Sequence, residues 1–192
     1  MKIPFLIGEK IYLRPLEKED LNRCLSWINN PAVINNLGRR FPTSRTQEEE
    51  WLVNQYKSNK SFSLAIVVNE GDYHIGNCGF NDIDYVNRKA VFGIMIGEKD
   101  YWDKGYGTEV TRLMIKYGFE QLNLHRISLT VYSHNARAIR VYEKAGFKLE
   151  GKMRESHFHN GRYYDTLIMA ILESEWKQAN NSELHQRGGN DG

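Results

Sequence analysis

The sequence predicts a single α/β (α+β) domain in which helices flank one central sheet. The apolar period switches several times between helical and extended along the 192 residues. No internal repeat or linker divides the chain, and its length suits one domain with a substantial core. The composition, 41% hydrophobic and 26% charged, is ordinary for a globular protein.

The first part of the chain predicts one strand followed by two helices. Residues 11–16 alternate like a half-buried strand. The next apolar residues recur on one helix face that ends before Pro31, namely Leu21, Cys24, Leu25 and Ile28. Thr46 and Glu49 match a capping box, so a second helix is expected to open there.

The middle of the chain predicts three consecutive strands. Residues 61–68 and 74–80 flank a short segment with Asn69 and Gly71, residue types that favour a hairpin turn. Residues 90–97 are apolar enough to form a third strand inside the sheet.

The last part of the chain predicts two helices, each followed by strands. A helix after Gly107 leads to a strand at 126–132, and the next helix runs from its N-cap Asn135 to Gly146. Two final strands, 147–156 and 163–172, are joined through Asn160-Gly161. The domain is expected to span 1–176, and the polar, glycine-rich segment 177–192 is expected to be a disordered tail.

Charge and cysteine usage exclude several classes of protein. With 26 basic and 24 acidic residues the formal charge is +2, which gives no argument for nucleic-acid binding. Cys24 and Cys78 lack the spacing of a zinc site, so we expect reduced thiols and no metal. No membrane-spanning run or cleavable leader is recognisable, and we therefore expect a soluble, cytoplasmic protein.

Gly105 and Gly107 stand just before a predicted helix, and two interpretations of this pair remain open. A tight turn with positive φ is the simpler one. In the other, the backbone N–H groups of residues 104–108 and the helix N-terminus form a cradle for an anion. The spacing matches neither a P-loop nor a dinucleotide-binding fingerprint.

Two blocks of sequence, 94–119 and 124–151, together resemble the acyl-CoA binding core of the GNAT superfamily of N-acetyltransferases. The similarity extends over about 8–176 and is strongest to the branch with ribosomal-protein N-terminal and spermidine acetyltransferases. This resemblance implies a mixed, mostly antiparallel sheet in which two strands splay apart to hold acetyl-CoA. Dimerisation is common in this family, so the resemblance also allows a homodimer.

The resemblance also implies which residues contact acetyl-CoA. Main-chain groups at Met95 and its neighbours would hold the pantetheine arm and polarise the thioester, and such an oxyanion donor is worth roughly 3 to 4 kcal/mol. Tyr142 would be the general acid for the departing thiolate. Asp103 departs from the family pattern and is expected to weaken CoA binding. The implied cofactor-binding residues are Ile94, Met95, Ile96, Trp102, Asp103, Lys104, Gly105, Tyr106, Gly107, Thr108, Asn135, Ala138 and Tyr142.

The general base is not evident, because Val91 stands where many relatives carry glutamate. Asp82 and Asp84 are the replacement candidates, with a solvated loop or a water chain without an essential base as alternatives. Histidine can act as a base near neutral pH, but we interpret His157 and His159 as polar residues of an exposed hairpin.

The acceptor is expected to contact residues 17–57 and 153–165, the segments that form the substrate wall in this family. Acidic residues there would suit a polyamine or be solvated helix faces, namely Glu17, Glu19, Asp20, Glu48, Glu49 and Glu50. Arg39 and Arg40 would instead face an acidic group. The leading hypothesis is direct acetyl transfer to a primary amine of a small molecule, either a polyamine or an amino sugar. The alternatives are a ribosomal-protein N-terminal acetyltransferase and a non-catalytic acyl-CoA binding module.

Overall fold

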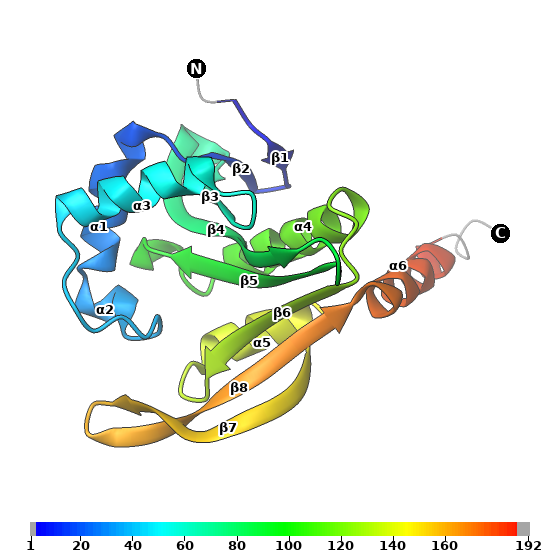
Figure 1. Cartoon of the computed structure of the whole chain (residues 1–192). Coiled ribbons are helices and arrows are strands. Elements are labelled where there is room, and N and C mark those ends of the chain that lie inside the picture. The colour runs from blue at the N-terminus through cyan, green and yellow to red at the C-terminus, as the bar shows by residue number, and fades with distance from the viewer. Residues whose placement is uncertain (1–2, 188–192) are drawn as a thin grey trace.

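An eight-stranded sheet with helices on both faces forms the protein in the computed structural model (Figure 1). The structure describes residues 3–187, with side chains as far as 181. The strands are β1 (Leu6–Ile7), β2 (Ile11–Pro15), β3 (Phe62–Val68), β4 (Tyr73–Asp84), β5 (Lys89–Ile96), β6 (Arg126–Tyr132), β7 (Lys148–His159) and β8 (Arg162–Leu172). The α-helices are α1 (Leu21–Ile28), α2 (Pro31–Ile34), α3 (Arg45–Lys57), α4 (Tyr106–Glu120), α5 (Ala136–Lys144) and α6 (Glu173–Arg187).

The strand order β1-β2-β3-β4-β5-β6-β8-β7 contains a single parallel pair, β5 with β6, and all other neighbours are antiparallel. The parallel pair joins only residues 89–91 to 126–128. Beyond Val91 the two strands have no common register, so they separate toward the C-terminal end of β5. The mixed, mostly antiparallel sheet with two splayed strands is therefore confirmed.

Each face of the sheet has its own apolar core. On one face, α4 and α5 pack through residues such as Met114, Ile115 and Tyr142. On the other face, α1, α2 and α3 pack through residues such as Trp27 and Leu52. Successive side chains of β2 and β3 point to opposite faces of the sheet, so they pack alternately into the two cores. The sheet thus separates two helical layers that meet only where β5 and β6 diverge.

A buried ion pair lies at the N-terminal end of α1, and the sequence pattern does not predict it. Arg14 on β2 donates from Nη1 and Nη2 to the two carboxylate oxygens of Asp20, at 2.6 and 2.7 Å. Burial alone would raise the pKa of Asp20, but the hydrogen bonds from Arg14 and His74 outweigh burial and hold the pKa far below the usual carboxyl range. The interpretation of Asp20 as a solvated residue was therefore wrong.

Two short elements and the N-terminus of one longer helix differ from the sequence predictions. The strand β1 and the helix α2, which begins at Pro31, were not predicted. Helix α3 is capped by Ser44 and Gln47, which bond reciprocally, rather than by Thr46 and Glu49. The other predicted strands, helices and the Asn160-Gly161 turn are present.

The segment expected to be a disordered tail overlaps α6, which continues from Glu173 to Arg187. Lys177 bonds Glu173 one turn earlier at 2.6 Å, and the Trp176 ring lies 5.6 Å from the Phe119 ring. These contacts and a helix-favouring composition offset the polarity of the segment. The rest of the predicted tail, 188–192, lies outside the described residues.

Candidate active site

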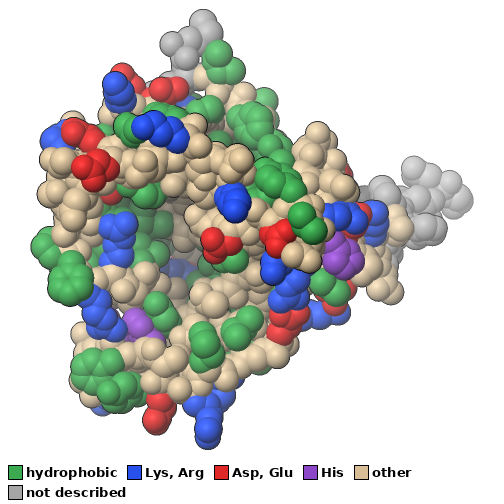
Figure 2. Space-filling view, in the orientation of Figure 1, with side chains coloured by type: hydrophobic (Ala, Val, Ile, Leu, Met, Phe, Trp, Pro, Cys, Tyr) green, Lys and Arg blue, Asp and Glu red, His purple; other side chains and the backbone are tan. Residues whose placement is uncertain are grey.

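A cavity of about 580 Å³ passes through the sheet at the divergence of β5 and β6. Its walls come from both helical layers, with Gly107 and Tyr142 on the α4–α5 side and Glu48 and Trp51 on the α3 side. Figure 2 shows the corresponding hollow near the centre of one face, with Lys and Arg side chains on both sides of it. The cavity therefore connects two chemically different halves, which we call the α4–α5 half and the α1–α3 half.

The N-terminus of α4 opens into the α4–α5 half. Gly105, its N-cap, has φ 89° and ψ −10°, a left-handed conformation that favours glycine. Gly107 differs, because it lies within the first helical turn and has no positive φ. The first turn of a helix leaves N–H groups without intrahelical partners and carries a positive partial charge. The two interpretations of the glycine pair are therefore compatible. Gly105 forms a turn with positive φ, and this turn exposes a helix N-terminus suited to an anion.

Three cations on α5 add positive charge to the same half. Arg137, Arg140 and Lys144 lie three, four and seven residues apart, which puts them on one side of the helix, and all three line the cavity. The Arg137 guanidinium lies 3.8 Å from the Trp102 ring centroid, and its Nη1 lies 3.8 Å from Asp103 Oδ2. Arg137 therefore offsets the negative charge at Asp103. The α4–α5 half fits a phosphorylated, multiply anionic ligand.

The exposed edge of β5 forms the wall between the two halves. Ile94, Met95 and Ile96 line the cavity and lie beyond the last residue of β5 that pairs with β6. The Trp102 indole nitrogen donates to the Ile96 carbonyl at 2.8 Å, which fixes this end of the strand. Backbone groups of β5 are thus available to a ligand that inserts between the two strands.

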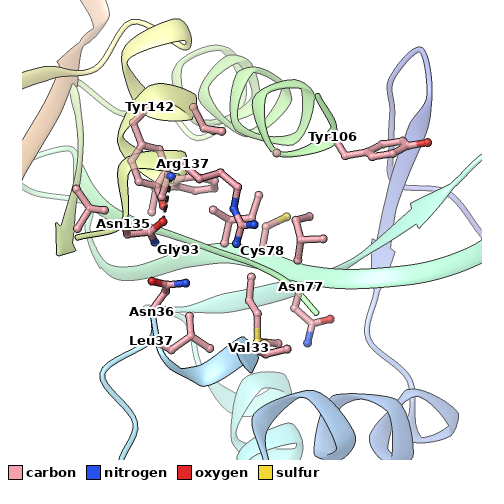
Figure 3. A pocket seen from close by; sticks show the side chains of 18 of the residues that line it. Val33, Asn36, Leu37, Asn77, Cys78, Gly93, Tyr106, Asn135, Arg137 and Tyr142 are labelled. Carbon is pink, nitrogen blue, oxygen red and sulfur yellow. Dashed lines mark hydrogen bonds between the residues drawn. The ribbon is translucent and has the colours of Figure 1, made fainter. Parts of the chain in front are cut away.

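Asn135, the N-cap of α5, and Tyr142 within α5 both line the cavity (Figure 3). The Asn135 side chain caps the helix by accepting from the Ala138 amide at 3.2 Å. The Tyr142 side chain is 7% exposed, and burial raises the pKa of its hydroxyl to about 12. Tyr142 therefore stays protonated at neutral pH and is a hydrogen-bond donor.

Glu48 brings a buried carboxylate to the α1–α3 half. Its side chain is 3% exposed, lines the cavity, and has no hydrogen bond or ion pair within 4 Å among the described residues. Burial raises the pKa of Glu48, and the nearby Arg39 only partly opposes the shift. An adjoining cavity of about 440 Å³ shares Arg39, Glu48 and Trp51. An unpaired buried carboxylate is costly, so its place in a cavity wall indicates a cationic ligand.

The two aspartates considered as replacement bases are not among the residues that line the cavity. They lie on the far end of β4 and not in a loop after it. Asp84 caps a turn by accepting from the Val86 and Asn87 amides at 3.0 and 2.9 Å, and hydrogen bonds with Asn87 lower its pKa. Asp82 is exposed, at the register shift between β4 and β5. Turn formation explains Asp84.

Two further residues lie elsewhere than expected. Lys104 is the one member of the implied cofactor-binding set that does not line the cavity, and its ammonium lies 5.8 Å from the Tyr101 ring centroid. His157 is buried, and its ring stacks 3.6 Å from that of Tyr132. The interpretation of His157 as an exposed hairpin residue was therefore wrong, whereas half-exposed His159 stacks beside it.

The cations of α5 could have been found in the sequence from their helical spacing, but the sequence carries no signal for Glu48. Glu48 lies in a run of three glutamates, and only the packing of α3 shows which of them is buried.

The two cysteines are free, as predicted, and both are buried. Cys78 lines the cavity, but burial raises the pKa of its thiol well above the usual range, so it remains protonated and is a poor nucleophile. Across residues 3–181, whose side chains the structure describes, no cluster of three or more His, Cys, Asp or Glu side chains is arranged to hold a metal ion. The same part of the chain has no helix long and apolar enough to cross a membrane.

Comparisons with known proteins agree with this geometry. Residues 10–148 match the family model described as the acetyltransferase (GNAT) domain. A spermidine N(1)-acetyltransferase from Vibrio cholerae is 33% identical over 170 residues, which cover 88% of this chain and 97% of the relative. An uncharacterised N-acetyltransferase, p20, from Bacillus licheniformis is 30% identical and covers 89% of this chain and 97% of the relative.

A solved structure gives the same result in three dimensions. The crystal structure of a spermidine N-acetyltransferase from Vibrio cholerae, in complex with CoA and spermine, superposes with a TM-score of 0.81 at 30% identity. The match covers 87% of this chain and 98% of that structure. The chain belongs to the GNAT family of acetyltransferases, and the acetyl-CoA-dependent N-acetyltransferase predicted from the sequence is confirmed.

Proposed function

We propose that the protein transfers an acetyl group directly from acetyl-CoA to a primary amine of a polyamine, and that Glu48 holds the cationic acceptor. The observation that carries this proposal is the buried, unpaired Glu48 carboxylate in a cavity continuous with the α4–α5 half. The relatives named as spermidine acetyltransferases support the same acceptor class.

In this proposal the α4–α5 half binds acetyl-CoA. The N-terminus of α4 receives the pyrophosphate, and Arg137, Arg140 and Lys144 neutralise phosphate charge. The pantetheine arm lies along β5, where residues 94–96 pair with β4 on one side and have no partner on the side that faces β6. The thioester then lies between the two halves, with its carbonyl against the backbone of Met95.

The acceptor must lose a proton before it can attack. Neutralising an amine of pKa about 10.4 at pH 7.4 costs about 4 kcal/mol. Within the described residues only Glu48 and Asp103 bring a carboxylate to the cavity, and Asp103 lies on the α4–α5 side. Glu48 binds the charged amine groups of the acceptor and accepts the released proton through water, because its raised pKa brings its basicity closer to neutral pH.

Attack on the thioester produces a nitrogen with a surplus proton and a thiolate leaving group. Complete proton transfer from a phenol of pKa about 12 to a thiolate of pKa about 8.5 is uphill by about 5 kcal/mol. Tyr142 therefore acts by donating a hydrogen bond to the departing sulfur, and the surplus proton passes from nitrogen to the thiolate through water, which gives the amide and the CoA thiol. This refines the general-acid role implied by the family resemblance.

The direct route does not need an acyl-enzyme. Cys78 is the thiol that lines the cavity, and its raised pKa leaves almost no thiolate to attack acetyl-CoA. The amine and acetyl-CoA must then be bound together, which the two halves of one cavity allow.

Thiol release from acetyl-CoA tests the proposal with spermidine, 1,4-diaminobutane, an amino sugar and a ribosomal-protein N-terminal peptide as acceptors. We expect turnover with spermidine and 1,4-diaminobutane, and intersecting lines in two-substrate initial-rate plots. Turnover only with the peptide would replace the polyamine by a protein N-terminus. Binding of CoA without turnover on any amine would instead support the non-catalytic binding module.

A further inference from the structure

Gly93 lies on the cavity wall without a conformational or steric need to be glycine. Its φ is outside the left-handed region, and a Cβ added there would find Asn81 Nδ2 as its nearest atom at 3.7 Å, an ordinary contact distance. The neighbouring strand glycines are different, because a Cβ would lie 2.1 Å from the Met95 carbonyl oxygen at Gly76 and 2.0 Å from the Phe62 carbonyl oxygen at Gly79. The fold therefore tolerates a side chain at 93.

Only two other described glycines share this property, Gly107 and Gly151. Gly107 lies at the N-terminus of α4, where the proposed pyrophosphate approaches the backbone closely. Gly151 lies on β7 beside a register shift, outside the cavity. Of the three, Gly93 is the one whose missing side chain leaves room in the wall between the two halves.

Gly93 occupies the place where the two halves meet. It pairs in register with Gly79, and it precedes Met95 by two residues on the same face of β5. Figure 3 shows it between Asn135 and Tyr142 on one side and Asn36 and Leu37 on the other. The two facing glycines leave bare backbone at the position that the reacting amine must reach.

The polar side chains around Gly93 can bind hydroxyl groups as well as ammonium ions. Asn36 and Asn81 line the cavity, and their carboxamides make no hydrogen bond within the described part of the chain. A carboxamide both donates and accepts, so it complements a hydroxyl group. An unbranched polyamine has no hydroxyl group that could bond to these carboxamides.

We propose that Gly93 is a specificity-determining residue, whose missing side chain admits primary amines borne on a ring or branched carbon, with amino sugars as the substrate class. This inference rests on the proposed function, because it assumes that the acceptor amine enters from the α1–α3 half. Slender terminal amines also fit the space, so the width of the acceptor, and not its charge, is what Gly93 controls.

The test compares 1,4-diaminobutane with trans-1,4-diaminocyclohexane, two diamines of equal charge but different width, and then spermidine with glucosamine. Acetylation by the wild-type protein, Gly93→Ala and Gly93→Val is followed by thiol release. Gly151→Ala is the matched control at a permissive glycine outside the cavity. CoA affinity and thermal unfolding of each variant report whether the fold and the α4–α5 half are intact.

We expect the wild-type protein to acetylate both diamines. Gly93→Ala should lower the ratio of kcat/KM for the ring diamine to that for the linear diamine by roughly 10-fold, the effect of one methyl group in a fitted site. Gly93→Val should lower the ratio further, and Gly151→Ala should leave it unchanged.

An unchanged ratio in the Gly93 variants overturns the inference, and so does a wild-type protein that acetylates linear diamines but neither ring amine. Both results leave polyamine acetylation standing. Absence of turnover on every amine would instead overturn the proposed function itself. If Gly93→Val does not fold, two measurements still test the inference: the kcat/KM ratio of the two diamines in Gly93→Ala, and the turnover of linear and ring amines by the wild-type protein.

Discussion

Two carboxylates are buried in the layer of α1, α2 and α3, and the protein holds them in opposite ways. Asp20 receives two hydrogen bonds from Arg14, and its pKa is lowered. Glu48 faces the cavity without such a partner, and its pKa is raised. The first carboxylate is satisfied by the fold and stabilises it, whereas the second binds the acceptor in the function proposed above. The difference shows how similar acidic residues acquire a structural or a binding role.

The largest expected effect comes from breaking the structural pair with Asp20→Asn. Removing one partner of a buried ion pair destabilises by about 3–5 kcal/mol, because Arg14 keeps an uncompensated charge. Urea unfolding at neutral pH measures the loss. Since the folded pKa of Asp20 is lowered, its stabilisation is complete above the unfolded carboxyl pKa of about 3.9 and is lost as the pH falls below it. A difference between variant and wild type that does not shrink at acidic pH would contradict this assignment.

The opposite change in stability is expected for Glu48→Gln. A raised carboxyl pKa destabilises the native state above that pKa, and the penalty disappears as the pH falls toward the unfolded value of about 4.3. The variant should therefore have a higher Tm than the wild type at neutral pH, while its kcat/KM for 1,4-diaminobutane falls by roughly 30-fold or more. The acid limb of the wild-type pH–rate profile should lie above the ordinary carboxyl range and vanish in the variant. A lower Tm would mean that Glu48 is paired as Asp20 is.

Tyr142→Phe separates binding from chemistry in the α4–α5 half. Its hydroxyl makes no hydrogen bond to another described residue, so the variant should keep its stability and CoA affinity. Loss of the hydrogen bond to the leaving sulfur should lower kcat by about 10²-fold. Pre-steady-state thiol release and CoA titration provide the two readouts. An unchanged kcat would remove Tyr142 from the reaction.

A smaller effect is expected from Arg137→Gln. The guanidinium lies over Trp102 and beside Asp103, so its loss removes a phosphate partner and leaves the Asp103 charge uncompensated. The Kd for CoA should rise about 10-fold, with kcat nearly unchanged. The double variant Arg137→Gln, Asp103→Asn should recover part of the affinity. No recovery would show that Asp103 does not act on the ligand.

The same contrast explains how much the sequence could predict. The α4–α5 half is built from contiguous segments, so residues 101–119 and 135–146 carried its turn, helix N-terminus and Tyr142 in local pattern. The α1–α3 half is assembled from residues distant in sequence, and burial of Glu48 depends on how α3 packs on the sheet. The position of Asp82 and Asp84 could not be predicted for the same reason, since it depends on the end of β4, where the register with β5 shifts between Asn81 and Asp84.

Direct titration of 1,4-diaminobutane into the CoA-bound protein tests the central claim, that Glu48 is kept unpaired for a cationic acceptor. The matched pair is Glu48→Gln and Glu49→Gln, because Glu49 lies next along α3, is 53% exposed and forms an ion pair with Arg45 at 3.9 Å. We predict that the Glu48 variant loses most of the diamine affinity and that the Glu49 variant binds as the wild type does. Equal diamine affinity in the wild type and both variants would contradict the claim.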